Sequence, residues 1–117
     1  MQYNLGLSQI PTLQLPTERE GCINSFWMYT IILPTSLSAK RDGVINLLMQ
    51  NGIESRPVFF PMHNMPPYAD YKQCGNEYPI SNRLSEGGIS LPSSVEVGES
   101  EIQRVCDVLS SCLEKLS

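Results

Sequence analysis

The clearest hydrophobic pattern lies at the C-terminal end of the chain. Between residues 99 and 116, apolar side chains recur every three or four positions, which is the spacing of one face of an α-helix. This face consists of Ile102, Val105, Cys106, Leu109, Cys112, Leu113 and Leu116. Glu99 and Glu101 favour the positive N-terminal end of a helix. The pattern therefore predicts a helix over 99–116 with one buried face.

Residues 26–33, with the sequence Phe-Trp-Met-Tyr-Thr-Ile-Ile-Leu, give the strongest strand signal. The segment is aromatic and β-branched, and both of its alternating faces are largely apolar. A strand of this kind is typical of the centre of a sheet that is covered on both sides. Because a chain of 117 residues has little material to cover both faces, we expect a second body to cover one of them.

A second helix is predicted over 39–51, directly after Ser38, which can act as its N-cap. Its buried stripe would contain Val44, Leu47 and Leu48. Gly52 suits the left-handed conformation that commonly ends a helix. Residues 53–59 then predict another strand, so that strand, helix and strand follow one another as an α/β unit.

The segment after this strand is rich in proline, with Pro57, Pro61, Pro66 and Pro67. Each proline fixes φ and removes a backbone donor, so we expect a stiff, extended connection beyond Phe60. The connection carries His63, the only histidine of the chain, and ends at Tyr68. A rigid loop that presents an imidazole, a phenol and apolar side chains could form one wall of a ligand site. Alternatively, His63 could serve only to pack the loop.

Shorter elements complete the predicted fold. Pro11 and Pro16 bracket a short strand over 12–15, after an N-terminal stretch without a clear period. Residues 68–78 are predicted to be irregular, with a turn at 74–76.

Pro79 is placed to begin a short helix over 80–86, which Gly87 and Gly88 would end, and 89–92 predict a last strand. The expected fold is a single α/β domain over 1–117. It would have a small, mainly antiparallel sheet with 26–33 at its centre, and the helices 39–51 and 99–116 would pack on that sheet.

Composition and charge exclude several classes of protein. The net charge is −4 and the eight Lys and Arg residues are spread thinly, which argues against a nucleic-acid-binding protein. No apolar run approaches the length of a membrane span and no secretory signal is visible, so we expect a cytoplasmic protein that does not bind a membrane. The low charged fraction of 17% suggests that a partner covers part of the surface.

The remaining local motifs indicate little chemistry. Cys22, Cys74, Cys106 and Cys112 form no Cys-x-x-Cys pair, so we expect reduced thiols and no metal site. A Gly-x-Ser-x-Gly elbow and a glycine-rich phosphate loop are both missing from the sequence, which argues against a self-contained hydrolase. Glu54 and Arg56 most simply form a surface ion pair.

The order of several short motifs is more informative than any one of them. They are Trp27-Met28-Tyr29, Arg41-Asp42, Asn51 to Pro57 (Asn-Gly-Ile-Glu-Ser-Arg-Pro), Phe59-Phe60-Pro61-Met62-His63, Pro66-Pro67-Tyr68 and Ile89-Ser90-Leu91-Pro92-Ser93. All of these motifs precede the closing helix, and the stretch of chain that follows the same pattern covers roughly 12–116. It resembles the C-terminal small domain of the pyridoxal-phosphate (PLP)-dependent sugar-nucleotide aminotransferases of fold type I, especially the perosamine synthetase-like members.

The resemblance implies transfer of an amino group, usually from glutamate, to a keto-sugar attached to a nucleotide. In this family PLP forms a Schiff base with a lysine of a large N-terminal domain, which this chain lacks. Lys40, Lys72 and Lys115 do not match the sequence context of that lysine. The chain alone is therefore not expected to bind PLP or to be catalytic.

The resemblance also implies which residues would face the substrate. By position they are Arg56, Phe59, Phe60, His63 and Tyr68, on the side of the domain that faces the active-site cleft of a dimer. Arg56 could hold an anionic group of the nucleotide sugar, because its forked guanidinium suits a carboxylate or a phosphate. His63 would be a hydrogen-bond donor to the substrate.

Several alternatives remain open at this point. The chain could be the small domain of a full-length enzyme, or the product of a truncated gene that begins at Met1 within the helix leading into that domain. It could also be a stand-alone module that binds a ligand or forms a homodimer through an exposed apolar surface. Independent catalysis is disfavoured by the missing lysine motif. Gly43 departs from the family pattern, because glycine is unusual inside a helix.

Overall fold

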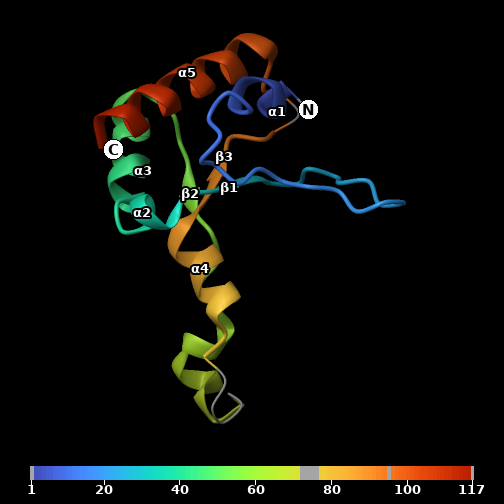
Figure 1. Cartoon of the computed structure of the whole chain (residues 1–117), viewed down its shortest axis with the longest axis vertical. Helices are drawn as coiled ribbons and strands as arrows, with labels where there is room; N and C mark the ends of the chain where they lie inside the picture. Colours follow the sequence, from blue (N-terminus) through green and yellow to red (C-terminus); the bar gives the residue numbers. More distant parts are fainter. Residues whose placement is uncertain (1, 72–76, 95, 117) are drawn as a thin grey trace.

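The computed structural model describes residues 2–71, 77–94 and 96–116 (Figure 1). The elements are α1 (Gln2–Leu7), β1 (Tyr29–Ile32), α2 (Thr35–Ser38), α3 (Arg41–Gln50), β2 (Arg56–Pro57), the 3₁₀ helices η1 (Met62–Asn64) and η2 (Pro66–Tyr71), α4 (Pro79–Gly87), β3 (Gly88–Leu91) and α5 (Glu99–Leu116). None of the helices in the described part of the chain is both long and apolar enough to cross a bilayer.

The three strands form one antiparallel sheet in the order β1-β3-β2. Tyr29 of β1 and Arg56 of β2 lie opposite Leu91 and Ser90 of β3. Because β1 and β2 both run antiparallel to β3, they are parallel to each other. The predicted strand–helix–strand unit is thus present, but β3 is inserted between its two strands. The prediction of a small antiparallel sheet with helices packed on it is confirmed.

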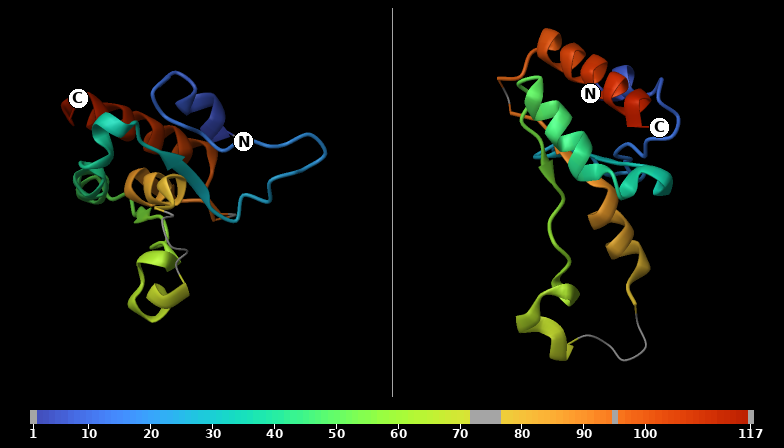
Figure 2. Two further views of the ribbon diagram at one scale, coloured as in Figure 1. Left: turned by 60° about the horizontal axis from the view of Figure 1, so that its bottom comes forward. Right: turned by 90° about the vertical axis from the view of Figure 1, so that its left-hand side faces the viewer.

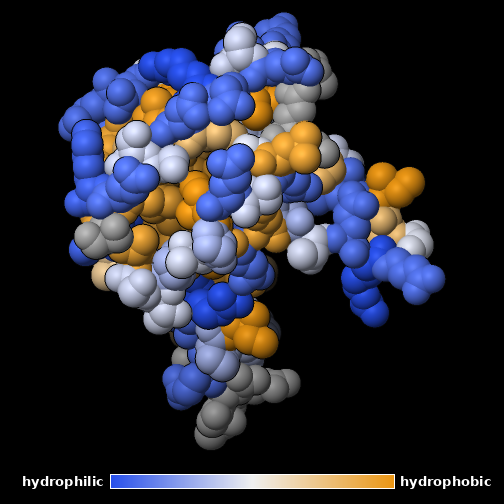
Figure 3. Space-filling view, turned by 45° about the horizontal axis from the view of Figure 1, so that its top comes forward, coloured by the Kyte–Doolittle hydropathy of each residue, from blue (hydrophilic) through white to orange (hydrophobic). Residues whose placement is uncertain are grey.

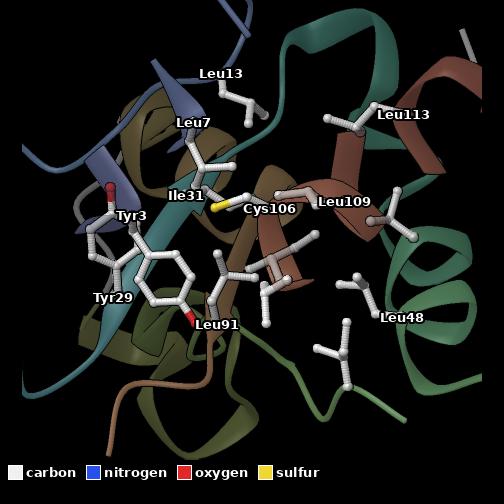
Figure 4. Packing of buried hydrophobic residues seen from close by; sticks show 14 of the residues in the cluster. Tyr3, Leu7, Leu13, Tyr29, Ile31, Leu48, Leu91, Cys106, Leu109 and Leu113 are labelled. Carbon is white, nitrogen blue, oxygen red and sulfur yellow. The ribbon is translucent and has the colours of Figure 1, made fainter. Parts of the chain in front are cut away.

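The hydrophobic core lies between one face of the sheet and the helices α1, α3 and α5 (Figure 4). Tyr29, Ile31 and Ile89 are fully buried in this cluster, together with Leu48 of α3 and Leu109 of α5. The predicted boundaries of α5 are confirmed, and every residue of its predicted face is buried except Leu116, which is half-buried.

The other face of the sheet is more polar. Thr30, Ser90 and Arg56 occupy directly opposed positions on the three strands, so their side chains share this face. The hydroxyl oxygens of Thr30 and Ser90 lie 3.2 Å apart, and Arg56 is exposed.

The prediction for residues 26–33 was wrong in both extent and position. β1 begins only at Tyr29, and the central strand of the three is β3. Phe26 has a φ of 51°, a left-handed conformation that a bulky residue rarely adopts and that cannot continue a strand. Apolar composition alone did not reveal this local change of direction.

Other boundaries also differ from the predictions. Ser38 is not an N-cap: it belongs to α2, and the residue that precedes α3 is Lys40, which makes no side-chain cap. Pairing over 12–15 is limited to one bridge between Gln14 and Ile32. The predicted strand over 53–59 is reduced to the two residues of β2.

Two predictions based on glycine and proline are confirmed. Gly52 has a φ of 75°, as expected for a left-handed helix end. Pro79 is the first residue of α4, which ends at Gly87.

The N-terminal helix α1 has no clear apolar period, but it lies where the resemblance implied a helix leading into the domain.

The expectation of an extended connection beyond Phe60 was wrong. The chain is extended at Pro61, with φ −64° and ψ 134°, but then forms η1 and η2. Pro66 is the first residue of η2, a position where its fixed φ favours a helical turn and its missing donor costs nothing. The predicted turn at 74–76 lies outside the described residues.

Two segments project from the body of the molecule. The first, named the arm, consists of residues 58–71 and α4, and it extends away from the helices α1, α3 and α5 (Figure 2). The second is the loop of residues 17–28, which has hydrophobic surface at its end (Figure 3). These projections explain a radius of gyration of 15.4 Å, compared with about 13 Å for a compact chain of this length.

Candidate functional site

Gly88 positions the arm at the point where it leaves the sheet. The Val58 amide donates to the Gly88 carbonyl at 3.2 Å. A Cβ atom at residue 88 would lie 2.3 Å from Cγ2 of Val58 and 2.4 Å from the carbonyl oxygen of Leu84. The absence of a side chain at Gly88 therefore allows both α4 and the chain at Val58 to lie close to the start of β3.

A first surface hollow, named hollow A, lies where β1 and β2 begin and β3 ends. It has a volume of about 440 Å³ and is lined by Trp27, Met28, Glu54, Ser55, Arg56, Pro57, Phe59, Ser90, Leu91 and Pro92. Two of the predicted site residues, Arg56 and Phe59, belong to it. The side chains of Trp27 and Phe59 are 76% and 69% exposed, so both rings are accessible to a ligand.

The polar groups of hollow A include one ion pair and two serines. Arg56 Nη2 donates to Glu54 Oε1 at 3.1 Å, which confirms the predicted surface pair. Both side chains are well exposed, and pairs of this kind contribute only about 0.2–1 kcal/mol, so a ligand anion could compete with Glu54 for Arg56. Ser55 Oγ is buried and makes no hydrogen bond to the described residues.

A second hollow, named hollow B, lies on the arm. It also has a volume of about 440 Å³ and is lined by Pro61, Met62, His63, Tyr68, Tyr71, Tyr78 and Ser81. His63 and Tyr68 were predicted as site residues, and here they border one concave surface. The fifth predicted residue, Phe60, lines neither hollow and is 62% exposed. The structure thus divides the predicted residues between two neighbouring surfaces.

His63 also connects two elements of the arm. Its Nε2 atom lies 2.8 Å from Oδ1 of Asn82 in α4, and its ring stacks on Tyr78 with a centroid distance of 4.5 Å. Asn64 Nδ2 donates to the same Asn82 oxygen at 3.2 Å. These contacts hold η1 against α4, so His63 has a packing role whatever ligand the arm binds.

Sequence reasoning missed several residues of these surfaces. Trp27 was assigned to a covered strand, and Tyr71 and Tyr78 lie in the segment predicted to be irregular. Tyr78 adopts the left-handed conformation, with φ 49°, directly before Pro79. Asn82 carries no sequence signal, because its partner His63 lies 19 residues away.

Four buried residues, Tyr3, Tyr29, Cys106 and Cys112, have raised pKa values. Burial raises the pKa of Tyr29 to about 12 and also raises the pKa of Tyr3. Burial raises the pKa of both Cys106 and Cys112, which lowers their thiolate fraction and hence their reactivity. These two cysteines and the exposed Cys22 are free thiols that form no disulfide. Cys74 lies outside the described residues.

Within the described residues, potential metal ligands are dispersed and both lysines lie outside hollows A and B. No three His, Cys, Asp or Glu side chains among them gather closely enough to hold a metal ion. Lys40 Nζ donates to the Leu116 carbonyl at 2.7 Å, and Lys115 lies in the last turn of α5. Both lysines are therefore at the α5 end of the molecule, away from the arm (Figure 1). Lys72 is not among the described residues. The described lysines do not fit a Schiff-base site beside the arm.

Comparison with known proteins gives consistent matches over nearly the whole chain. Residues 1–110 match the sequence profile of the DegT/DnrJ/EryC1/StrS aminotransferase family. The GDP-perosamine synthase of Vibrio cholerae is 34% identical over 107 residues, which cover 92% of this chain and 29% of that protein. The GDP-perosamine synthase of Caulobacter vibrioides is 44% identical over 88 residues, which cover 75% of this chain and 23% of that protein. The chain thus spans about a quarter of the length of these relatives.

Solved structures agree with the architecture. The aminotransferase TlmJ from Streptoalloteichus hindustanus superposes with a TM-score of 0.84 at 21% identity, over 99% of this chain and 30% of that chain. PseC from Helicobacter pylori, an aminotransferase involved in the biosynthesis of pseudoaminic acid, gives a TM-score of 0.84 at 14% identity, over 97% of this chain and 30% of that chain. At these identities the likeness establishes the fold.

Proposed function

Because this chain belongs to the DegT/DnrJ/EryC1/StrS aminotransferase family, we propose that it forms the substrate-facing C-terminal part of an aminotransferase for nucleotide-linked keto-sugars. The observation that carries the proposal is its similarity to GDP-perosamine synthases at up to 44% identity. The proposed activity belongs to the assembled enzyme and not to this chain alone.

The two hollows support complementary roles in binding such a substrate. In hollow A, Arg56 offers a guanidinium suited to a phosphate, while Trp27 and Phe59 offer aromatic faces on which a flat base can stack. The described lining of hollow B contains no Lys or Arg and is rich in tyrosine. We therefore assign the charged nucleotide portion to hollow A and the uncharged sugar to hollow B.

The cofactor would be held by other parts of the enzyme. In aminotransferases PLP serves as the electron sink for the amino transfer. Lys40 and Lys115 both lie at the α5 end of the molecule, away from the arm, which supports this assignment. In the proposal, this chain contributes substrate binding, and the Schiff-base lysine belongs to a large domain.

The exposed apolar side chains of the arm are proposed to face protein in the assembled enzyme. Phe60, Met62 and Ile80 are all more than 60% exposed. Such a cluster is unusual on a monomer and is typical of an interaction surface. It also supports a second candidate function, a module that forms a homodimer through the arm. In either case we place the protein in the cytoplasm.

The proposal is tested by incubating the purified chain with PLP, followed by dialysis and an absorbance spectrum. We expect no retained band near the visible edge. A band that survives dialysis, together with borohydride labelling of one lysine, would show that the chain has its own cofactor site.

Sedimentation at several protein concentrations tests the second candidate. A dimer that dissociates when Phe60 and Met62 are changed to serine would favour the module. The double change Leu5→Ser and Met49→Ser provides a matched control, because both side chains are exposed outside the arm.

A further inference from the structure

Asn82 is the best-anchored polar side chain near hollow B. Its Nδ2 atom donates to the Glu77 backbone carbonyl at 2.8 Å. Its Oδ1 atom faces both Asn64 Nδ2 at 3.2 Å and His63 Nε2 at 2.8 Å. A backbone carbonyl can only accept a hydrogen bond, so the contact with Glu77 fixes which end of the Asn82 amide is the nitrogen.

This orientation determines which nitrogen of His63 carries a proton. The Oδ1 atom of Asn82 can only accept, so His63 Nε2 must donate to it. A neutral imidazole has one protonated nitrogen, and the other nitrogen is then an acceptor. The stacking of the ring on Tyr78 at 4.5 Å further limits its rotation. No hydrogen bond joins His63 Nδ1 to the described residues, and the His63 side chain borders hollow B.

We propose that Asn82 is a positioning residue that holds the proton of His63 on Nε2, so that Nδ1 accepts a hydrogen bond from a ligand hydroxyl in hollow B. This inference rests on the proposed function for the identity of the ligand, a nucleotide-linked sugar. It differs from the resemblance, which implied that His63 donates to the substrate. An acceptor at this place favours a sugar hydroxyl and disfavours a phosphate oxygen, which has no proton to donate.

The described lining of hollow B agrees with an uncharged, hydroxyl-bearing ligand. Tyr68 and Tyr71 supply apolar ring faces with polar ends, and Ser81 supplies a further hydroxyl. Together these groups could bind a sugar ring between aromatic surfaces and polar contacts.

The tautomer can be measured directly, because His63 is the only histidine of the chain. A long-range ¹H–¹⁵N spectrum of the untagged, ¹⁵N-labelled chain distinguishes a protonated imidazole nitrogen from an unprotonated one. The spectrum is recorded at about pH 8, above the ordinary titration range of histidine near 6.5. Asn82→Ala removes the acceptor, whereas Asn82→Asp retains one. Asn64→Ala is the matched control, because it removes the other contact to Asn82 and leaves the bond to His63.

We expect one dominant form in the wild type and in Asn64→Ala, with Nε2 protonated and Nδ1 unprotonated. Asn82→Ala should shift the ring toward a mixture of tautomers, and Asn82→Asp should keep the proton on Nε2. A proton on Nδ1 in the wild type would overturn the proposal, as would an unchanged tautomer in Asn82→Ala. Loss of stability alone, without a change of tautomer, would indicate a merely structural contact.

Ligand recognition is tested with GDP-mannose as the probe and GDP as the control without a sugar. GDP-mannose should shift the Nδ1 resonance and GDP should not. Asn82→Ala should weaken binding of GDP-mannose by about tenfold, as expected for one hydrogen bond, with GDP binding unchanged. GDP-mannose binding that leaves Nδ1 unshifted would contradict the acceptor role. No binding of either nucleotide would count against the proposed function, while the tautomer of the free chain still decides the role of Asn82.

Discussion

Replacing Gly88 by alanine tests how the arm is attached to the sheet. The new methyl group would lie 2.3 Å from Val58 Cγ2 and 2.4 Å from the Leu84 carbonyl oxygen, compared with about 3.5 Å for a favourable carbon contact. Val58 is held by its hydrogen bond to the Gly88 carbonyl, and the Leu84 oxygen belongs to the backbone of α4. Neither neighbour can move without disturbing the base of the arm.

The magnitude follows from the overpacking that the methyl group imposes. Inserting a methyl group into a packed site costs about 1–3 kcal/mol, and the backbone neighbour at Leu84 favours the upper part of that range. Gly43→Ala is a matched control in α3, because its Cβ would meet no atom within 4 Å. There the same chemical change should stabilise the helix by about 1 kcal/mol.

Thermal unfolding followed by circular dichroism measures both variants. At about 4 °C per kcal/mol for a domain of this size, Gly88→Ala should lower Tm by about 4–12 °C and Gly43→Ala should raise it by about 4 °C. The essential result is that Tm falls in Gly88→Ala and rises in Gly43→Ala. A Gly88→Ala variant as stable as the wild type would refute the packing described at the base of the arm.

Two further predictions concern the core. Gly6→Ala should destabilise the contact of α1 with α5 by about 1–3 kcal/mol, because its Cβ would lie 2.6 Å from Cys106 Sγ. In urea unfolding, the same change should cost clearly less in a Cys106→Ala background, where this sulfur is absent. Equal costs in the two backgrounds would contradict the contact. Because burial raises the pKa of Tyr29 from 10.0 to about 12, its neutral phenol contributes stability that is complete below about pH 10 and is lost as the pH rises toward 12. The free energy of unfolding should therefore fall over this interval, less steeply in Tyr29→Phe, and a flat profile in the wild type would refute this assignment.

The elements that could be predicted from sequence are those whose signals are local and repeated. The face of α5 repeats over 18 residues, so its boundaries follow from periodicity. The left-handed turn at Gly52 and the start of α4 at Pro79 follow from the chemistry of single residues. The position of β1 could not be predicted in this way, because the order of strands depends on the pairing of Tyr29 with the distant Leu91.

The candidate site shows the same difference between local signals, which sequence reveals, and long-range contacts, which it does not. The segment that carries Arg56, Phe59, His63 and Tyr68 was identified from its prolines and from the family resemblance. The grouping of these residues into two hollows depends on the 3₁₀ turns η1 and η2. These turns were not predicted, because the prolines of this segment indicated an extended chain. The Asn82 contact likewise joins elements far apart in sequence, so only the folded chain reveals it.

The most direct test of the proposed function is a chimera in which this chain replaces the matching region of the Vibrio cholerae GDP-perosamine synthase. We predict that the chimera retains bound PLP and forms GDP-perosamine. Changing Arg56 and His63 to alanine in the chimera should lower kcat/KM for the nucleotide sugar by at least about tenfold, with the PLP spectrum unchanged. A PLP-loaded chimera that forms no product would contradict the role assigned to this chain. An unchanged kcat/KM in the chimera that carries both substitutions would contradict it as well.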